Sequence, residues 1–158
     1  PRTSCPTCWR CTGTCMPPLA IVFLVGWMVR WPWITRLYAL CLISFLLTGL
    51  VCQVLQALTR RQRPDTSASA RDWHGPSLRS THRSFPSGHA SASASVLVVI
   101  GLLAQGLPWV SAICYTLTAL TALSRLNDKA HWPSDVFTGC CIGAGIAWLA
   151  VMAPFLPR

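Results

Sequence analysis

The sequence contains no glutamate, and its four acidic residues are outnumbered by 13 lysines and arginines. Charged residues make up 11% of the 158 residues, less than half of the roughly 25% that is usual in soluble domains. This scarcity of charge argues against a soluble domain. The shortage of carboxylates leaves no acidic cluster for a divalent cation. The basic excess comes without a nucleic-acid recognition motif, so nucleic acid is not an expected partner.

Hydrophobic residues make up 53% of the chain and occur in continuous blocks, as in membrane proteins. A helix needs roughly 20 apolar residues to cross a bilayer. An earlier block, Leu19–Val29, is marginal because it has only eleven residues before Arg30 interrupts it. The sequence therefore predicts an all-α transmembrane bundle of about four to five spans. The four principal spans are Leu37–Leu58, Ala90–Leu107, Trp109–Leu123 and Val136–Ala153.

We expect residues 1–18 to form a disordered, cysteine-rich tail, and residues 19–158 to form one transmembrane domain with a polar loop at 59–88. The tail cysteines have the spacing of one ferredoxin cluster run. Met16 follows that run where a proline is usual, and the chain has no second run. A metal or redox function of the tail is therefore the less favoured alternative. The four cysteines concerned are Cys5, Cys8, Cys11 and Cys15.

The loop at 59–88 holds six of the 13 basic residues. A basic loop beside a membrane commonly sets orientation or contacts anionic lipid. That reading remains open for the loop as a whole. The six residues are Arg60, Arg61, Arg63, Arg71, Arg79 and Arg83.

Three polar motifs flank the predicted spans. Consecutive spans run in opposite directions, so the end of one span and the start of the next share a membrane face. The motifs are therefore expected to meet on one face, although they are spread over about 80 residues of sequence. They run from Gln56 to Pro64, from Pro86 to His89, and from Ser124 to Asp135.

The residue types in these motifs suit a phosphate group. Arg63 and Arg125 are permanent cations whose planar forks match phosphate oxygens. Ser87 and Gly88 open a predicted helix, where free backbone N–H groups favour an anion. With no carboxylate cluster to hold a metal, arginines would have to stabilise the charge of a transition state.

Two histidines add acid–base and nucleophilic chemistry. His89 and His131 titrate near neutrality and can act as proton donor and nucleophile. Asp135 lies four residues after His131, and Pro133 suits the first position of the intervening helix. We expect Asp135 to accept a hydrogen bond from the His131 ring and to fix its tautomer. Alternatively, His131 and Trp132 are an interfacial aromatic pair, Arg125 is a membrane anchor and Asp135 only complements a helix dipole.

The combination of Arg63-Pro64, Pro86-Ser87-Gly88-His89 and Ser124-Arg125-x5-His131-x3-Asp135 resembles the type 2 phosphatidic acid phosphatase superfamily. The resemblance implies a helical membrane bundle that hydrolyses phosphate esters through a phosphohistidine, without metal or cofactor. It also implies that His131 is the nucleophile, with Asp135 behind it, and that His89 protonates the leaving oxygen. By the same resemblance, the phosphate would be bound by Arg63, Arg125, Ser87 and Gly88.

The chain departs from this family pattern at Gln56, where a lysine is usual. Arg60, one helical turn further along, is the candidate replacement for the missing cation. Because of this departure, a catalytically silent protein that binds phosphate or lipid head groups remains the alternative. Phosphatidate, phosphatidylglycerol phosphate and polyprenyl diphosphate all fit a site at the membrane surface. The resemblance favours a bacterial cytoplasmic membrane with the site on its outer face.

Overall fold

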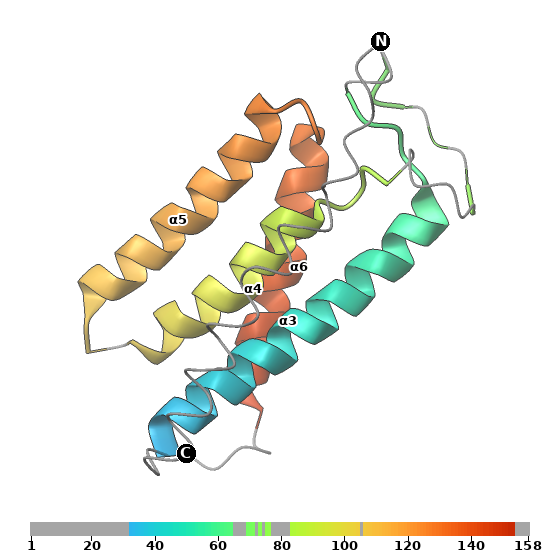
Figure 1. The fold of residues 1–158 in the computed structure, drawn as a ribbon. Coiled ribbons are helices and arrows are strands. Elements are labelled where there is room, and N and C mark those ends of the chain that lie inside the picture. Colours follow the sequence, from blue (N-terminus) through green and yellow to red (C-terminus); the bar gives the residue numbers. More distant parts are fainter. Residues whose placement is uncertain are drawn as a thin grey trace. The chain divides into compact units, whose positions relative to one another are not determined.

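The computed structural model describes residues 32–64, 69–71, 73, 75–76, 83–104 and 106–153. The chain divides into two compact units, Pro1–Ala39 and Leu40–Arg158. All the motif residues belong to the second unit. The regular elements in the described ranges are four α-helices, labelled as in Figure 1. They are α3 (Pro32–Thr59), α4 (Gly88–Leu103), α5 (Pro108–Asn127) and α6 (Pro133–Met152).

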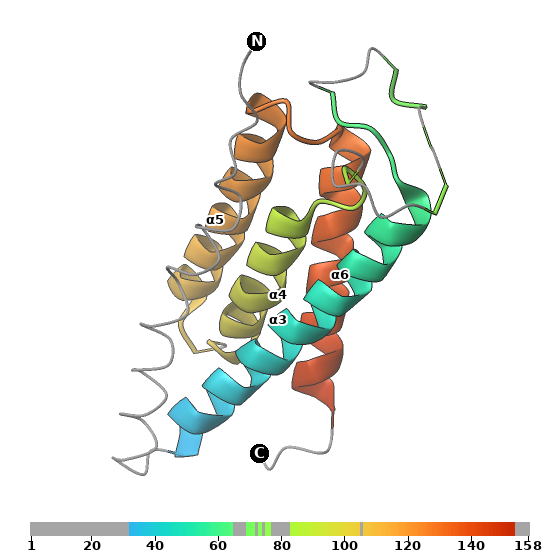
Figure 2. The same ribbon diagram turned by 45° about the vertical axis from the view of Figure 1, so that its right-hand side comes forward.

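Within the unit that begins at Leu40, α4 lies among α3, α5 and α6, and successive helices run in opposite directions (Figures 1 and 2). The end of α3, the start of α4, the end of α5 and the start of α6 all lie at the same end of the bundle. The expectation that the three motifs share one face is therefore confirmed for these helix ends.

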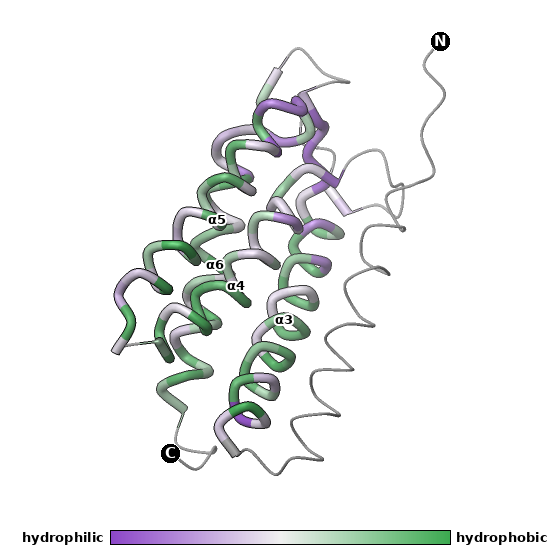
Figure 3. Tube along the Cα trace, turned by 60° about the vertical axis from the view of Figure 1, so that its left-hand side comes forward, coloured by the Kyte–Doolittle hydropathy of each residue, from purple (hydrophilic) through white to green (hydrophobic). Residues whose placement is uncertain are grey.

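Two of the four expected spans are confirmed as helices long and apolar enough to cross a membrane, over Trp33–Thr59 and Pro133–Met152. The helix α4 is apolar but shorter, at 16 residues. The span count of four to five is thus only partly supported, and Leu19–Val29 lies outside the described residues. Figure 3 shows hydrophobic residues along the helices and hydrophilic residues where α5 joins α6.

The helices α4 and α6 approach each other closely through glycines. A Cβ atom at Gly139 would lie 2.6 Å from the Ser87 carbonyl oxygen. One at Gly143 would lie 2.9 Å from both the Ser95 nitrogen and the Ala94 Cβ. Small residues at such spacing let membrane helices pack at close range. This contact brings together the helix starts that carry His89 and His131.

Small polar residues also line the contact between α3 and α4. The Cys52 thiol donates a hydrogen bond of 3.1 Å to the Ser91 hydroxyl oxygen. Ser44, Thr48 and Ser95 are fully buried in the same unit. Large apolar side chains such as Leu50 are instead exposed on the outside. This distribution of polar and apolar side chains suits a bundle surrounded by lipid.

Candidate functional site

The start of α4 is held by its own cap and by α6. Ser87 is the N-cap residue, and its hydroxyl oxygen accepts a hydrogen bond of 3.5 Å from the Ala90 N–H. The Ser87 N–H donates to the Asp135 carbonyl at 2.9 Å. Ser87 is fully buried, so its side chain serves the helix start. The N–H groups at this helix end, including that of Gly88, favour an anion.

Gln56 lies against this helix start. Its Nε2 donates to the Pro86 carbonyl at 3.0 Å. The same nitrogen is the nearest atom to the position of a Cβ at Gly88, at 3.8 Å. The residue that replaces the usual lysine therefore contacts the loop that leads into the site.

Arg60, the candidate replacement for the missing cation, lies just outside the helix that carries Gln56. The helix α3 ends at Thr59, and Arg60 has a φ of +47°. A left-handed residue directly after a helix is a common way of ending it. The reversal turns the Arg60 side chain away from the direction that helix geometry predicts. Its guanidinium is buried and has no hydrogen-bond acceptor among the described residues.

His131 is oriented by a backbone carbonyl. Its Nδ1 lies 2.8 Å from the Ser84 carbonyl oxygen. A carbonyl can only accept, so Nδ1 carries the proton and Nε2 keeps a lone pair. The pKa of His131 is lowered to about 4, chiefly because burial disfavours the imidazolium. The ring is therefore neutral near neutral pH, with one nucleophilic nitrogen.

The expected hydrogen bond between Asp135 and the His131 ring is not the one observed, because Ser84 occupies that ring nitrogen. Asp135 is fully buried at the third position of α6. Its Oδ2 accepts from the Trp132 N–H at 3.0 Å, as acidic residues at this position commonly do. The same oxygen accepts from the Ser84 hydroxyl, and Oδ1 pairs with Arg61. The hydrogen-bonded path from Asp135 to His131 thus runs through Ser84, and the carboxylate charge also acts on the ring across space.

The cationic residues and the histidines of the motifs converge. Arg63 and Arg125 both act electrostatically on His89, and Arg63 and His89 both act on His131. The pKa of His89, in the first turn of α4, is lowered by burial and by the nearby Arg125 and Arg63 guanidiniums. A negatively charged phosphate among these groups would reverse that effect. In the described residues there is no group of three or more His, Cys, Asp or Glu that could hold a metal ion.

Arg125 has partners that the sequence did not predict. Its Nη2 lies 3.0 Å from the Asp128 carboxylate and donates to the Ser124 hydroxyl at 2.8 Å. Both partners lie close in sequence, around the end of α5. They hold the guanidinium near the bundle end that carries the two histidines.

Sequence reasoning missed two residues of this network, Arg61 and Ser84. The excess of arginine over acidic residues indicates that a buried aspartate would find an arginine partner. Three arginines lie within four positions at 60–63, however, and only the end of α3 decides which one faces Asp135. Ser84 acts partly through its carbonyl, which no side-chain pattern reveals.

Comparisons with known proteins agree on one family. A family model described as the PAP2 superfamily matches residues 36–156. A decaprenylphosphoryl-5-phosphoribose phosphatase of Mycobacterium tuberculosis is 36% identical over 96 residues, which are 61% of this chain and 49% of the relative. A lipid A 1-phosphatase of Porphyromonas gingivalis is 31% identical over 84 residues, covering 52% and 16%. The chain thus spans about half the length of the first of these relatives.

Solved structures share the fold. The transmembrane PAP2-type phosphatidylglycerolphosphate phosphatase from Bacillus subtilis superposes with a TM-score of 0.67 and 26% identity. That match covers 90% of this chain and 72% of the other. Aquifex aeolicus LpxE has a TM-score of 0.64 at 22% identity, covering 87% and 75%.

Proposed function

The chain belongs to the PAP2 superfamily, and we propose that it is an integral membrane phosphatase acting on a phosphomonoester or diphosphate of a lipid. The observation that carries the proposal is the state of His131. This buried, neutral imidazole has its Nδ1–H held by a carbonyl, and it lies within electrostatic reach of Arg63 and His89. A nucleophile, a proton donor and a phosphate-binding cation are the parts that phosphoryl transfer requires.

In the first step of the proposed mechanism, the His131 Nε2 attacks phosphorus and the bond from phosphorus to the lipid oxygen breaks. His89, protonated beside the bound phosphate, gives its proton to the leaving oxygen. The ring of His131 gains positive charge as the bond forms. The Ser84 carbonyl and the nearby Asp135 both stabilise that charge.

In the second step, water attacks the phosphohistidine and the N–P bond breaks. His89, now neutral, takes a proton from the water. Inorganic phosphate leaves, and His131 returns to its neutral tautomer. Arg63, Arg125 and the N–H groups at the start of α4, such as that of Gly88, bind the equatorial oxygens throughout, without a metal ion. Ser87 supports this anion site as the cap of the helix, because its own N–H donates to the Asp135 carbonyl.

The position of the site supports a substrate with its tail in lipid and its phosphate in water. The motif residues lie at one end of apolar helices, next to the hydrophilic segments. The two relatives described above are named for phosphatases of large lipids, which favours a lipid or polyprenyl phosphate here. We further propose that the protein lies in a bacterial cytoplasmic membrane with this end outward, the location that the resemblance of its motifs favours.

Phosphate release from a short-chain lipid phosphate, by purified protein in detergent with EDTA present, tests the proposed function. We expect turnover in EDTA equal to that without it. Binding of the lipid phosphate without release of phosphate would instead identify a silent binding protein. Activity that EDTA removes and a divalent cation restores would contradict the metal-independent mechanism.

The pH dependence follows from the two histidines. The mechanism needs His131 neutral, which holds above its pKa of about 4. It also needs His89 protonated, and its pKa in the free protein is lowered from 6.5. We therefore expect kcat/KM to be greatest on the acid side of neutrality, with an acid limb near pH 4. A pH series with the wild type and His89→Ala, which should lose the alkaline limb, checks this.

Variants at Gln56 and Arg60 test whether Arg60 supplies the positive charge of the missing lysine. If the Arg60 guanidinium binds the phosphate, Arg60→Gln should lower kcat/KM about tenfold or more, because a charge-assisted hydrogen bond contributes roughly 1.5–3 kcal/mol. Gln56→Lys should then change little. If no residue supplies the positive charge of the missing lysine, Gln56→Lys should raise kcat/KM by a similar factor and Arg60→Gln should have little effect. Equal, small effects of both variants would remove these two residues from the phosphate site.

A further inference from the structure

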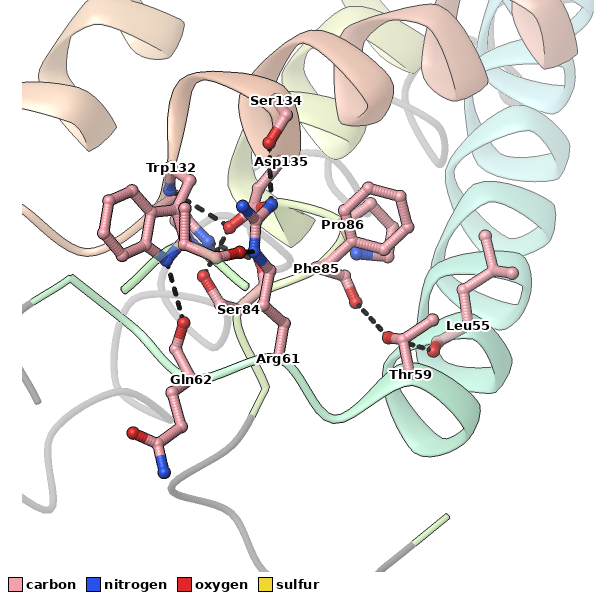
Figure 4. Close-up of polar contacts among 12 residues, drawn as sticks. Leu55, Thr59, Arg61, Gln62, Ser84, Phe85, Pro86, Trp132, Ser134 and Asp135 are labelled. Carbon is pink, nitrogen blue, oxygen red and sulfur yellow. Dashed lines mark hydrogen bonds and ion pairs between the residues drawn. The ribbon is translucent and has the colours of Figure 1, made fainter. Parts of the chain in front are cut away.

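Arg61 is held by several contacts beside the proposed site. Its side chain is 7% exposed and pairs with the Oδ1 of Asp135, which is fully buried. The Nη1 that makes this ion pair also donates to the Ser134 hydroxyl at 2.6 Å, and Nε donates to the Ala70 carbonyl at 2.9 Å. Figure 4 shows the guanidinium pointing at Asp135 and Ser134, beside the indole of Trp132.

Two indole rings lie near the Arg61 guanidinium. The Arg61 Cζ lies 5.0 Å from the centre of the Trp73 ring and 5.5 Å from that of Trp132. Both distances are within the range of cation–π attraction. The Trp132 Nε1 in turn donates to the Gln62 carbonyl at 2.9 Å. Arg61 is therefore fixed in place between the loop and the start of α6.

These contacts distinguish Arg61 from an arginine that binds the substrate phosphate. Its Nη1 and Nε donate to groups of the protein, and its positive charge compensates the buried Asp135. A buried carboxylate that lost its cation would keep an uncompensated negative charge. Arg61 therefore balances the negative charge of Asp135 next to His131.

The network continues from Arg61 to His131 through Ser84. The Ser84 N–H donates to the Arg61 carbonyl at 3.1 Å, and the Ser84 hydroxyl donates to Asp135. The Ser84 carbonyl accepts from the His131 Nδ1 at 2.8 Å. Ser84 is itself fully buried. One short segment thus connects the Arg61–Asp135 ion pair to the ring of the proposed nucleophile.

We propose that Arg61 is a positioning residue, which sets the orientation and proton affinity of His131 through Asp135 and Ser84. This inference rests on the proposed function, because the effect is read out in the chemistry of His131. The motif from Gln56 to Pro64 would then have two roles. Arg63 would bind the substrate phosphate, and Arg61 would position the nucleophile.

The role has a kinetic signature. Arg61→Gln should lower kcat about tenfold or more and leave KM within about twofold, since the substrate contacts remain. The uncompensated Asp135 charge would favour the imidazolium, so the acid limb of kcat/KM should move above pH 4. Arg61→Lys, which keeps the charge but not the planar fork, should retain intermediate activity.

A double-mutant cycle provides the sharper test. Asp135→Asn removes the carboxylate charge, so it should partly relieve the defect of Arg61→Gln, and the double variant should exceed Arg61→Gln in kcat. The two effects should be strongly non-additive, as expected for residues in direct contact. Arg71→Gln is the matched control, because Arg71 is exposed in the same loop; it should behave as wild type.

The experiment uses purified full-length protein in detergent, with phosphate release from a short-chain lipid phosphate between pH 3.5 and 8. A wild type that releases no phosphate would overturn the proposed function itself. The role of Arg61 alone would be overturned if the wild type is active and Arg61→Gln keeps the wild-type kcat, whether or not its KM changes. Additive effects of the two substitutions with an unmoved acid limb would also overturn it. A selective loss of kcat, a shifted acid limb and partial relief by Asp135→Asn would support it.

Discussion

Replacing His131 with alanine should reduce phosphate release by about a hundredfold or more, because it removes the group that forms the covalent bond to phosphorus. The remaining arginines and the start of α4 would still bind and polarise the phosphate, so KM should change much less than kcat. Initial rates on a short-chain lipid phosphate in detergent measure both quantities.

The control for this substitution is His74→Ala, which changes a histidine of the loop at 59–88 outside the three motifs. It should retain wild-type kcat. Equal amounts of both variants in the membrane fraction would show that insertion is unaffected. Turnover by His131→Ala above about one per cent of wild type would defeat its assignment as the nucleophile.

Substituting the glycines between α4 and α6 should have the largest effect on stability. A Cβ at Gly143 would meet backbone and side-chain atoms of α4 at 2.9 Å and the Ser91 carbonyl still closer. Gly143→Ala must therefore separate the helices, and overpacking of this kind typically costs about 1–3 kcal/mol. We expect a Tm lower by several degrees in detergent, together with reduced activity, because the two histidine-bearing helix starts move apart.

Gly145→Ala is the matched control on the same helix, because no atom lies within 4 Å of the position of its Cβ. It should leave the Tm unchanged or raise it slightly, since alanine favours a helix over glycine. For the same decrease in Tm, Gly139→Ala should lose more activity than Gly143→Ala. The reason is that its Cβ would meet the Ser87 carbonyl, at the start of α4. Equal Tm values for Gly143→Ala and Gly145→Ala would contradict the close packing of α4 and α6.

Much of the fold follows from the sequence because apolar blocks separated by polar segments allow few arrangements in a membrane. The four principal blocks are helices, and the alternation of their direction brings the three motifs together. Helix boundaries were less accurate, since the third block extends beyond Leu123 to Asn127. The start of α4 at Gly88, after the cap residue Ser87, agrees with the polar-to-apolar change at that point.

For the site, the sequence predicts members but not the connections between them. His89, His131, Arg63 and Arg125 lie near helix ends at one end of the bundle and act electrostatically on one another, and their roles in the site stay predictions. The partner of the His131 ring was wrong, since spacing along a helix says nothing about a carbonyl supplied by a distant loop. Arg60 and Arg61 could not be told apart from sequence, because the left-handed turn at Arg60 sets which way each side chain points.

The most direct test of the central claim is to trap the intermediate. The protein is mixed with a lipid phosphate that carries a labelled phosphoryl group, and the reaction is stopped within one turnover under alkaline conditions, which preserve phosphohistidine. The peptide that carries the label is then identified by mass spectrometry. A phosphoryl group on His131, absent from His131→Ala and discharged when water is allowed to react, is the predicted result. Turnover without any labelled protein, or a label on a residue other than His131, would contradict the account.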